Sequence, residues 1–136
     1  MNGKERVNLS KVIEKMNLVN LTPDIDVKGI WIHVPEFNRP ALQLTGFYDQ
    51  FDNDRIQIIG NVEYSYLERY MQLLSSNIPC LIFCRNLEPE AEIIELAKKY
   101  QIPILKSEES TSSFSAEVIR WLKVQLAPCI VIHGVL

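Results

Sequence analysis

Short apolar runs alternate with amphipathic helical patterns in the second half of the chain, and this alternation limits the fold more than any other feature. Residues 80–84 read CLIFC directly after Pro79. The run is too short for a helix and is flanked by turn formers, so it predicts a buried strand. Residues 102–106 predict a second strand, with Pro103 near its beginning, where a missing backbone donor costs least. Residues 129–133 predict a third.

A helical stripe precedes the first of these strands. Its apolar residues recur at intervals of three and four: Leu67, Tyr70, Met71 and Leu74. Ser65 and Glu68 have the spacing of a capping box near the start of the same segment. We therefore expect an amphipathic helix here.

A second helix is expected between the first two strands. Pro89 suits the first helical position, because the donor that proline lacks has no partner there. Glu90 and Glu92 favour the positive amino end of a helix, and Lys98 and Lys99 favour the negative carboxyl end.

A third helix is expected to begin among the serine and threonine residues 110–113, which are good N-caps. One side of it carries Phe114, Val118, Trp121, Leu122 and Gln125. Pro128 ends it. Strands that alternate with helices of this length imply parallel β-α-β units, so we expect an α/β fold, a layered domain with a mainly parallel or mixed sheet.

The first sixty residues are less regular. A short helix is expected over Leu9, Val12, Ile13 and Met16, and strands over residues 29–34 and 56–59. Between these strands, a loop from Arg39 to Arg55 combines aromatic and charged side chains, which is typical of a recognition surface. The alternative is that its aromatic residues close the core while Asp–Arg pairs hold the loop. The candidate interaction residues are Arg39, Phe47, Tyr48, Asp52, Asp54 and Arg55.

Composition narrows the class of protein. A chain of 136 residues with 47% hydrophobic content fits one domain. A formal net charge of -3 argues against nucleic acid as a partner, because such binding needs a basic surface. The sequence holds no apolar stretch of membrane-spanning length, and its three cysteines show no CxxC spacing. We expect a soluble cytoplasmic protein with reduced thiols and no membrane partner.

Sequence motifs for catalysis or cofactor binding are absent. The five glycines are widely separated, so neither GxGxxG nor GxxxxGK[ST] occurs. Cys80 and Cys84 are best explained as buried apolar residues, and His33 and His133 lie far apart in the sequence, so we expect no metal site. No cofactor is expected in this chain, and we expect it not to be an enzyme by itself.

Three strings of the sequence closely resemble HPr kinase/phosphorylases: NRPALQLTGFYDQFDNDRIQIIGNVEYSYLE at 38–68, CLIFCRNLEPEAEIIELAKKYQIPIL at 80–105 and LAPCIVIHGVL at 126–136. The chain departs from the family at Ala41, where the family usually has glycine. The resemblance implies an amino-terminal domain at 1–128, with a fold similar to that of the Mur ligase amino-terminal domain, and the start of a P-loop catalytic domain at 129–136. His133 would then lie near the phosphate site of the parent enzyme.

The resemblance also implies what the parent does. It phosphorylates a seryl residue of HPr with ATP or pyrophosphate and Mg2+, removes the phosphate by phosphorolysis, and controls carbon catabolite repression. The expected partners of this chain are the catalytic domain of the same parent chain, HPr and, in a homo-oligomer, further copies. We expect a non-catalytic regulatory or assembly domain. The alternatives are a small-ligand-sensing domain and, more weakly supported, an autonomous enzyme.

Overall fold

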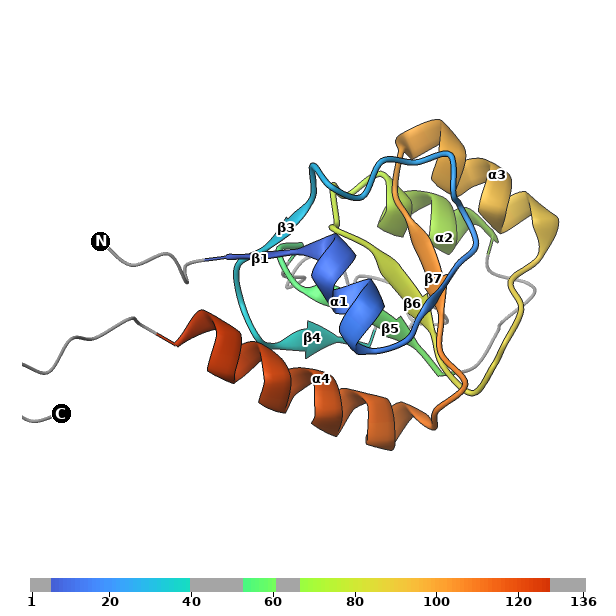
Figure 1. Ribbon diagram of the computed structural model, residues 1–136. Coiled ribbons are helices and arrows are strands. Elements are labelled where there is room, and N and C mark those ends of the chain that lie inside the picture. Colours follow the sequence, from blue (N-terminus) through green and yellow to red (C-terminus); the bar gives the residue numbers. More distant parts are fainter. Residues whose placement is uncertain (1–5, 40–52, 61–66, 128–136) are drawn as a thin grey trace, which may run out of the picture.

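A five-stranded sheet forms the centre of the computed structural model, which describes residues 6–39, 53–60 and 67–127 (Figure 1). The strands lie in the order β2 (Val19–Asn20), β7 (Ile104–Lys106), β6 (Leu81–Phe83), β5 (Ile56–Ile59) and β4 (Phe37–Asn38). Strands β4 to β7 are parallel, and β2 pairs antiparallel with β7 at one edge. The expected α/β fold with a mixed, mostly parallel sheet is therefore confirmed.

The two strands predicted from residues 80–84 and 102–106 are parallel neighbours, as the β-α-β pattern requires. Ile82 lies beside Leu105 across the β6–β7 pair and beside Ile58 across the β5–β6 pair. The connections also agree with the prediction, since one helix separates β5 from β6 and another separates β6 from β7.

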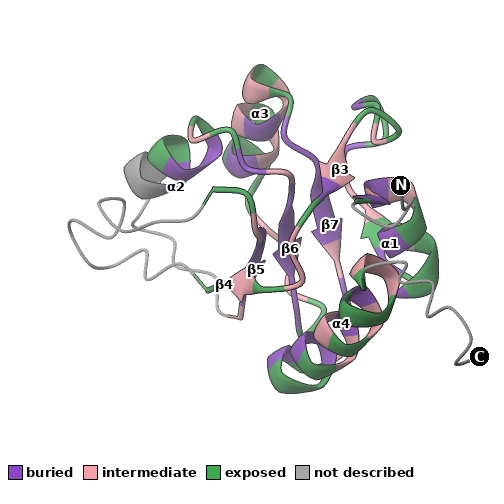
Figure 2. Cartoon of the chain, turned by 90° about the vertical axis from the view of Figure 1, so that its left-hand side faces the viewer, coloured by how far each residue is buried: buried purple, intermediate pink, exposed green. Residues whose placement is uncertain are grey.

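Four helices within the described residues cover the two faces of this sheet. They are α1 (Leu9–Lys15), α2 (Leu67–Leu74), α3 (Ala91–Tyr100) and α4 (Thr111–Leu126). Helices α1 and α4 lie on one face, and α2 and α3 lie on the other (Figures 1 and 2). A small antiparallel sheet of β1 (Val7–Asn8) and β3 (Trp31–Ile32) lies beside α1. The result is a three-layer arrangement.

Strand β6 shows how the sequence pattern creates two cores. Side chains alternate between the faces of a strand. Cys80, Ile82 and Cys84 accordingly belong to the core under α1 and α4, whereas Leu81 and Phe83 belong to the core under α2 and α3. All five are fully buried, which explains why the run is apolar without a break (Figure 2).

The start of α4 agrees with the serine and threonine cluster in the sequence. Ser110 is the N-cap, and its hydroxyl oxygen accepts a hydrogen bond of 3.2 Å from the Ser113 backbone N–H. Phe114, Val118 and Leu122 are fully buried on the sheet-facing side, while Trp121 and Gln125 are half-buried. Helix and cap were both predictable, because each follows from local pattern.

Two details of the predicted helices are wrong. Met71 was expected on the apolar stripe of α2, but it is exposed, because Tyr70, Leu73 and Leu74 face the sheet. Pro89 was expected at the first helical position of α3. Instead the carbonyl of Glu90 accepts the first bonds of that helix, so Glu90 is its N-cap.

The strand expected at 29–34 is shorter than predicted and lies in the small sheet, because only Trp31 and Ile32 pair with β1. The two-residue strands β1, β2 and β4 were not predicted. The expected capping box at Ser65, the strand at 129–133 and the domain boundary after residue 128 lie outside the described residues. No helix in the described ranges is long and apolar enough to cross a membrane.

Candidate functional site

The carboxyl ends of the parallel strands meet at one edge of the sheet, which we call the carboxyl edge. Arg39 follows β4, Gly60 follows β5, Arg85 follows β6 after Cys84, and residues 107–111 lead from β7 into α4. Open α/β sheets bind ligands outside the carboxyl ends of their strands. The carboxyl edge is therefore the candidate site.

Gly60 lies at the centre of this edge. A Cβ atom added to Gly60 would lie 2.8 Å from the Thr111 hydroxyl oxygen and 3.5 Å from Nη2 of Arg39. The Arg85 guanidinium donates a hydrogen bond of 3.1 Å from Nη1 to the Gly60 carbonyl. Two guanidinium groups and a hydroxyl group thus meet around one residue that has no side chain.

The backbone after β6 adopts an unusual conformation that positions Arg85. Arg85 and Asn86 have φ values of 61° and 58°, in the left-handed region. That region costs non-glycine residues about 1–2 kcal/mol each. Two hydrogen bonds hold it: the Arg85 N–H donates to the Glu109 carbonyl at 2.7 Å, and the Asn86 N–H donates to the Ser107 carbonyl at 2.8 Å. The loop after β6 is therefore tied to the loop after β7.

Cys84 lies beneath the carboxyl edge and is fully buried. Burial, together with the charge of Glu109, raises the pKa of its thiol to about 11, although the Arg39 charge and a hydrogen bond from Thr111 act in the opposite direction. Burial raises the pKa of Cys80 to about 12. Both residues are thiols near neutral pH, and a thiol is a poor nucleophile, so the site has no activated cysteine.

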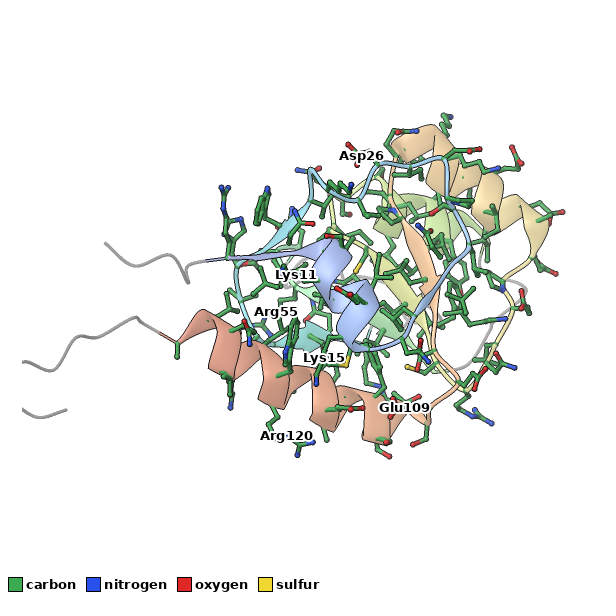
Figure 3. The ribbon with its side chains drawn as sticks, in the orientation of Figure 1. Lys11, Lys15, Asp26, Arg55, Glu109 and Arg120 are labelled. Carbon is green, nitrogen blue, oxygen red and sulfur yellow. The ribbon has the colours of Figure 1, made fainter. Side chains whose placement is uncertain are left out.

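Charged side chains of both signs gather at this edge. Arg39 and Arg85 lie here with Glu109, whose Oε1 accepts a hydrogen bond of 2.9 Å from the Ser113 hydroxyl. Glu108 belongs to the same segment, and Lys106 forms an ion pair with Glu88. Figure 3 shows Glu109 at the beginning of α4. Among the described residues, no three His, Cys, Asp or Glu side chains gather to hold a metal ion. The guanidinium groups of Arg39 and Arg85 beside Gly60 are donors of the kind that bind anions.

The structure separates the described members of the predicted interaction loop. Arg39 follows the carboxyl end of β4, whereas Asp54 and Arg55 precede the amino end of β5. Because β4 and β5 are parallel, these residues lie at opposite edges of the sheet. Phe47, Tyr48, Asp52 and, near the chain end, His133 lie outside the described residues. Their proposed roles remain predictions.

A hollow of about 490 Å³ lies at the opposite, amino edge of the sheet. Asp54 lines it together with Trp31, His33, Tyr100 and Gln101. Arginine and lysine are not among its lining residues, so its chemistry differs from that of the carboxyl edge. It could accommodate an uncharged molecule, but the lining shows no convergent set of charged groups.

Gly60, Arg85 and Thr111 were not singled out from the sequence. A signal was available, because Gly60 and Arg85 come within two residues of apolar runs predicted to be parallel strands, and Thr111 lies in the predicted N-cap cluster. The rule that carboxyl ends of parallel strands meet at one edge would have brought them together. Their contacts depend on tertiary structure and could not be read from the sequence.

Comparison with known proteins identifies the family. The family model described as "HPr Serine kinase N terminus" matches residues 7–122. An HPr kinase/phosphorylase of Lachnoclostridium phytofermentans is 53% identical, and one of Alkaliphilus metalliredigens is 40% identical; each match covers 96% of this chain. The chain spans only 45% of the length of either relative.

A solved structure has a similar fold. It contains the CBS and DRTGG domains of the regulatory region of Clostridium perfringens pyrophosphatase, complexed with its activator diadenosine tetraphosphate. The match has a TM-score of 0.62 and 17% sequence identity, and it covers 92% of this chain and 52% of that chain. This likeness concerns the fold alone. The family match over most of the sequence decides identity: the chain belongs to the family of HPr serine kinase amino-terminal domains.

Proposed function

We propose that this chain is a non-catalytic regulatory and assembly domain of a bifunctional HPr(Ser) kinase/phosphorylase. The parent would phosphorylate a seryl residue of HPr with ATP or pyrophosphate and Mg2+, and would remove the phosphate again by phosphorolysis. It would act in the cytoplasm in the control of carbon catabolite repression. The partners of the domain would be the catalytic domain of the same chain and further copies in a homo-oligomer.

One observation carries this proposal. Relatives named HPr kinase/phosphorylase match almost the whole chain, yet the chain covers less than half of their length. Phosphoryl transfer depends on loop amides, a lysine and magnesium that position and neutralise the phosphate. The glycines of this sequence are too widely separated to form such a loop. The chemistry therefore belongs to the remaining part of the parent.

Several finer expectations belong to the same proposal. The domain would end at residue 128, and residues 129–136 would begin the catalytic domain, with His133 near its phosphate site. The fold of the domain would be similar to that of the Mur ligase amino-terminal domain, as the family resemblance implies. The sequence composition supports a reduced cytoplasmic compartment, since its three cysteines show no disulfide-like spacing.

A small-ligand-sensing domain is the second candidate. The convergence of Arg39 and Arg85 at Gly60 favours it, because paired arginines bind carboxylates and phosphates well. The two candidates are compatible, since a bound ligand can alter assembly of the parent.

The test has two parts. The reading frame downstream of codon 136 in the genome should encode GxxxxGKS shortly afterwards. The purified chain should transfer no labelled phosphate from ATP or pyrophosphate to HPr. A continuous reading frame without a phosphate loop, or phosphorylation of HPr by the isolated chain above background, would overturn the proposal.

A further inference from the structure

Two arginines from different strands converge on the carboxyl edge, and nothing in the proposed catalytic role of the parent accounts for them. We propose that Arg39 and Arg85, together with the cradle at Gly60, bind the phosphate group of a small phosphorylated molecule. This inference deepens the proposed regulatory function by naming the class of ligand and its site. Binding itself can be measured on this chain without the parent enzyme.

The positions of the guanidinium groups are the first support. Nη2 of Arg39 lies 3.5 Å from the place where a Gly60 Cβ would be, and Nη1 of Arg85 lies 3.1 Å from the Gly60 carbonyl oxygen. Both groups therefore border the same small region, although β4 and β6 lie on either side of β5 in the sheet. Guanidinium donors match the geometry of phosphate oxygens, and both arginines are exposed to incoming solutes.

The backbone of the loop after β6 is the second support. A left-handed conformation is costly for Arg85, and residues held in such conformations often occur at ligand sites. The hydrogen bonds from Arg85 and Asn86 to the loop after β7 fix this conformation. From this conformation the arginine side chain reaches back to the Gly60 carbonyl. A loop whose backbone is held in this way loses less entropy on binding.

The absence of a side chain at Gly60 is the third support. Its Cβ would lie only 2.8 Å from the Thr111 hydroxyl oxygen, closer than real Cβ contacts. Gly60 thus lets the end of β5 approach the first turn of α4 while Arg39 reaches across it. A methyl group here would intrude between Thr111 and Arg39.

Two of the acidic side chains at this edge have partners of their own. The Ser113 hydroxyl donates a hydrogen bond to the Glu109 carboxylate, and Glu88 forms an ion pair with Lys106. The amino-edge hollow has no arginine or lysine among its lining residues, so it is the poorer candidate for a phosphate.

The test uses the chain itself, labelled with 15N and titrated with inorganic phosphate and with pyrophosphate at constant ionic strength. We expect saturable shifts of the backbone amide signals of Gly60, Arg85 and Thr111. Arg39→Gln should weaken binding at least about tenfold, because it removes charge-assisted hydrogen bonds. The matched control is Arg120→Gln, because Arg120 is also exposed and lies on α4, with its side chain directed away from the sheet (Figure 3). It should leave binding unchanged within about twofold.

A second variant keeps the proposal testable if Arg39→Gln perturbs the fold. Gly60→Ala should weaken binding while the spectrum stays that of a folded domain. The proposal is overturned if neither anion gives saturable shifts, if the shifts spread over the lysines of α1 and α3, or if Arg120→Gln weakens binding as much as Arg39→Gln. None of these outcomes concerns HPr phosphorylation, so failure of the phosphate site is distinguishable from failure of the proposed function.

Discussion

Gly60 and Thr111 should be energetically coupled, because an alanine at position 60 cannot fit beside the threonine hydroxyl. The Cβ of Gly60→Ala would lie 2.8 Å from that oxygen. Overpacking of this kind costs about 1–3 kcal/mol. Gly60 does not have a left-handed φ, so the backbone itself would accept alanine.

Removing the hydroxyl should relieve the clash. Thr111→Ala alone should cost about 1 kcal/mol, because it removes the hydrogen bond to Cys84. In that background the atoms nearest to an alanine Cβ at position 60 are Nη2 of Arg39 at 3.5 Å and Cβ of residue 111 at 3.7 Å, both ordinary contacts. Gly60→Ala should then be neutral or should stabilise by about 0.4–1 kcal/mol, since alanine lowers the entropy of the unfolded chain.

The assay is urea denaturation monitored by tryptophan fluorescence. It is applied to the wild-type chain, to Gly60→Ala, to Thr111→Ala and to the double variant. We expect a coupling free energy of about 1–4 kcal/mol, with the double variant more stable than the sum of the single effects predicts. Gly29→Ala is the control, because no atom lies within 4 Å of its added Cβ. It should show no coupling to Thr111→Ala. A coupling below about 0.3 kcal/mol for the Gly60 pair would refute the packing described here.

Three further predictions concern the thiols and α4. The free energy of unfolding should fall between pH 9 and about 11. In that range the thiols of the unfolded chain ionise with their ordinary pKa of 9.0, whereas Cys80 and Cys84 of the folded protein stay protonated. Below pH 9 this effect is absent. Cys80→Ala should reduce the fall by up to about 1.4 kcal/mol per pH unit in urea titrations, and an unchanged slope would contradict the prediction. Ser110→Ala should cost about 1 kcal/mol through loss of the α4 cap, whereas exposed Ser112→Ala should cost less than about 0.5 kcal/mol; equal losses would argue against the cap. Phe114→Ala should cost about 3–5 kcal/mol in the same assay, because the ring is fully buried, and a loss below about 1 kcal/mol would contradict that burial.

Local patterns account for the parts of the fold that were predicted. The run 80–84 could be identified as a strand because both faces of β6 are buried, so every residue of it is apolar or a cysteine. Helix α4 could be identified because its cap and its buried stripe lie within one segment. The parallel pairing followed from the alternation of helices and strands, which leaves few possible topologies.

Tertiary contacts decide what could not be predicted. Strands β1, β2 and β4 have two paired residues each, too few for a periodic signal. Met71 follows the helical period but lies just beyond the arc that faces the sheet, and only packing of α2 sets the limits of that arc. The meeting of Arg39, Gly60 and Thr111 depends on the sheet order, because these residues are far apart in the sequence. From the sequence, Arg39 and Arg55 were expected in one loop, whereas the two residues lie at opposite edges of the sheet.

The initial rate of HPr seryl phosphorylation tests the proposed regulatory role most directly. It should be measured for the full-length parent, for the parent without the segment that corresponds to residues 1–128, and for this chain alone. A non-catalytic regulatory domain predicts no turnover by the chain alone, and turnover by the shortened parent with an altered oligomeric state or an altered response to phosphate. Phosphorylation of HPr by the chain alone, or a shortened parent whose rate, assembly and phosphate response all match those of the full-length enzyme, would contradict this role.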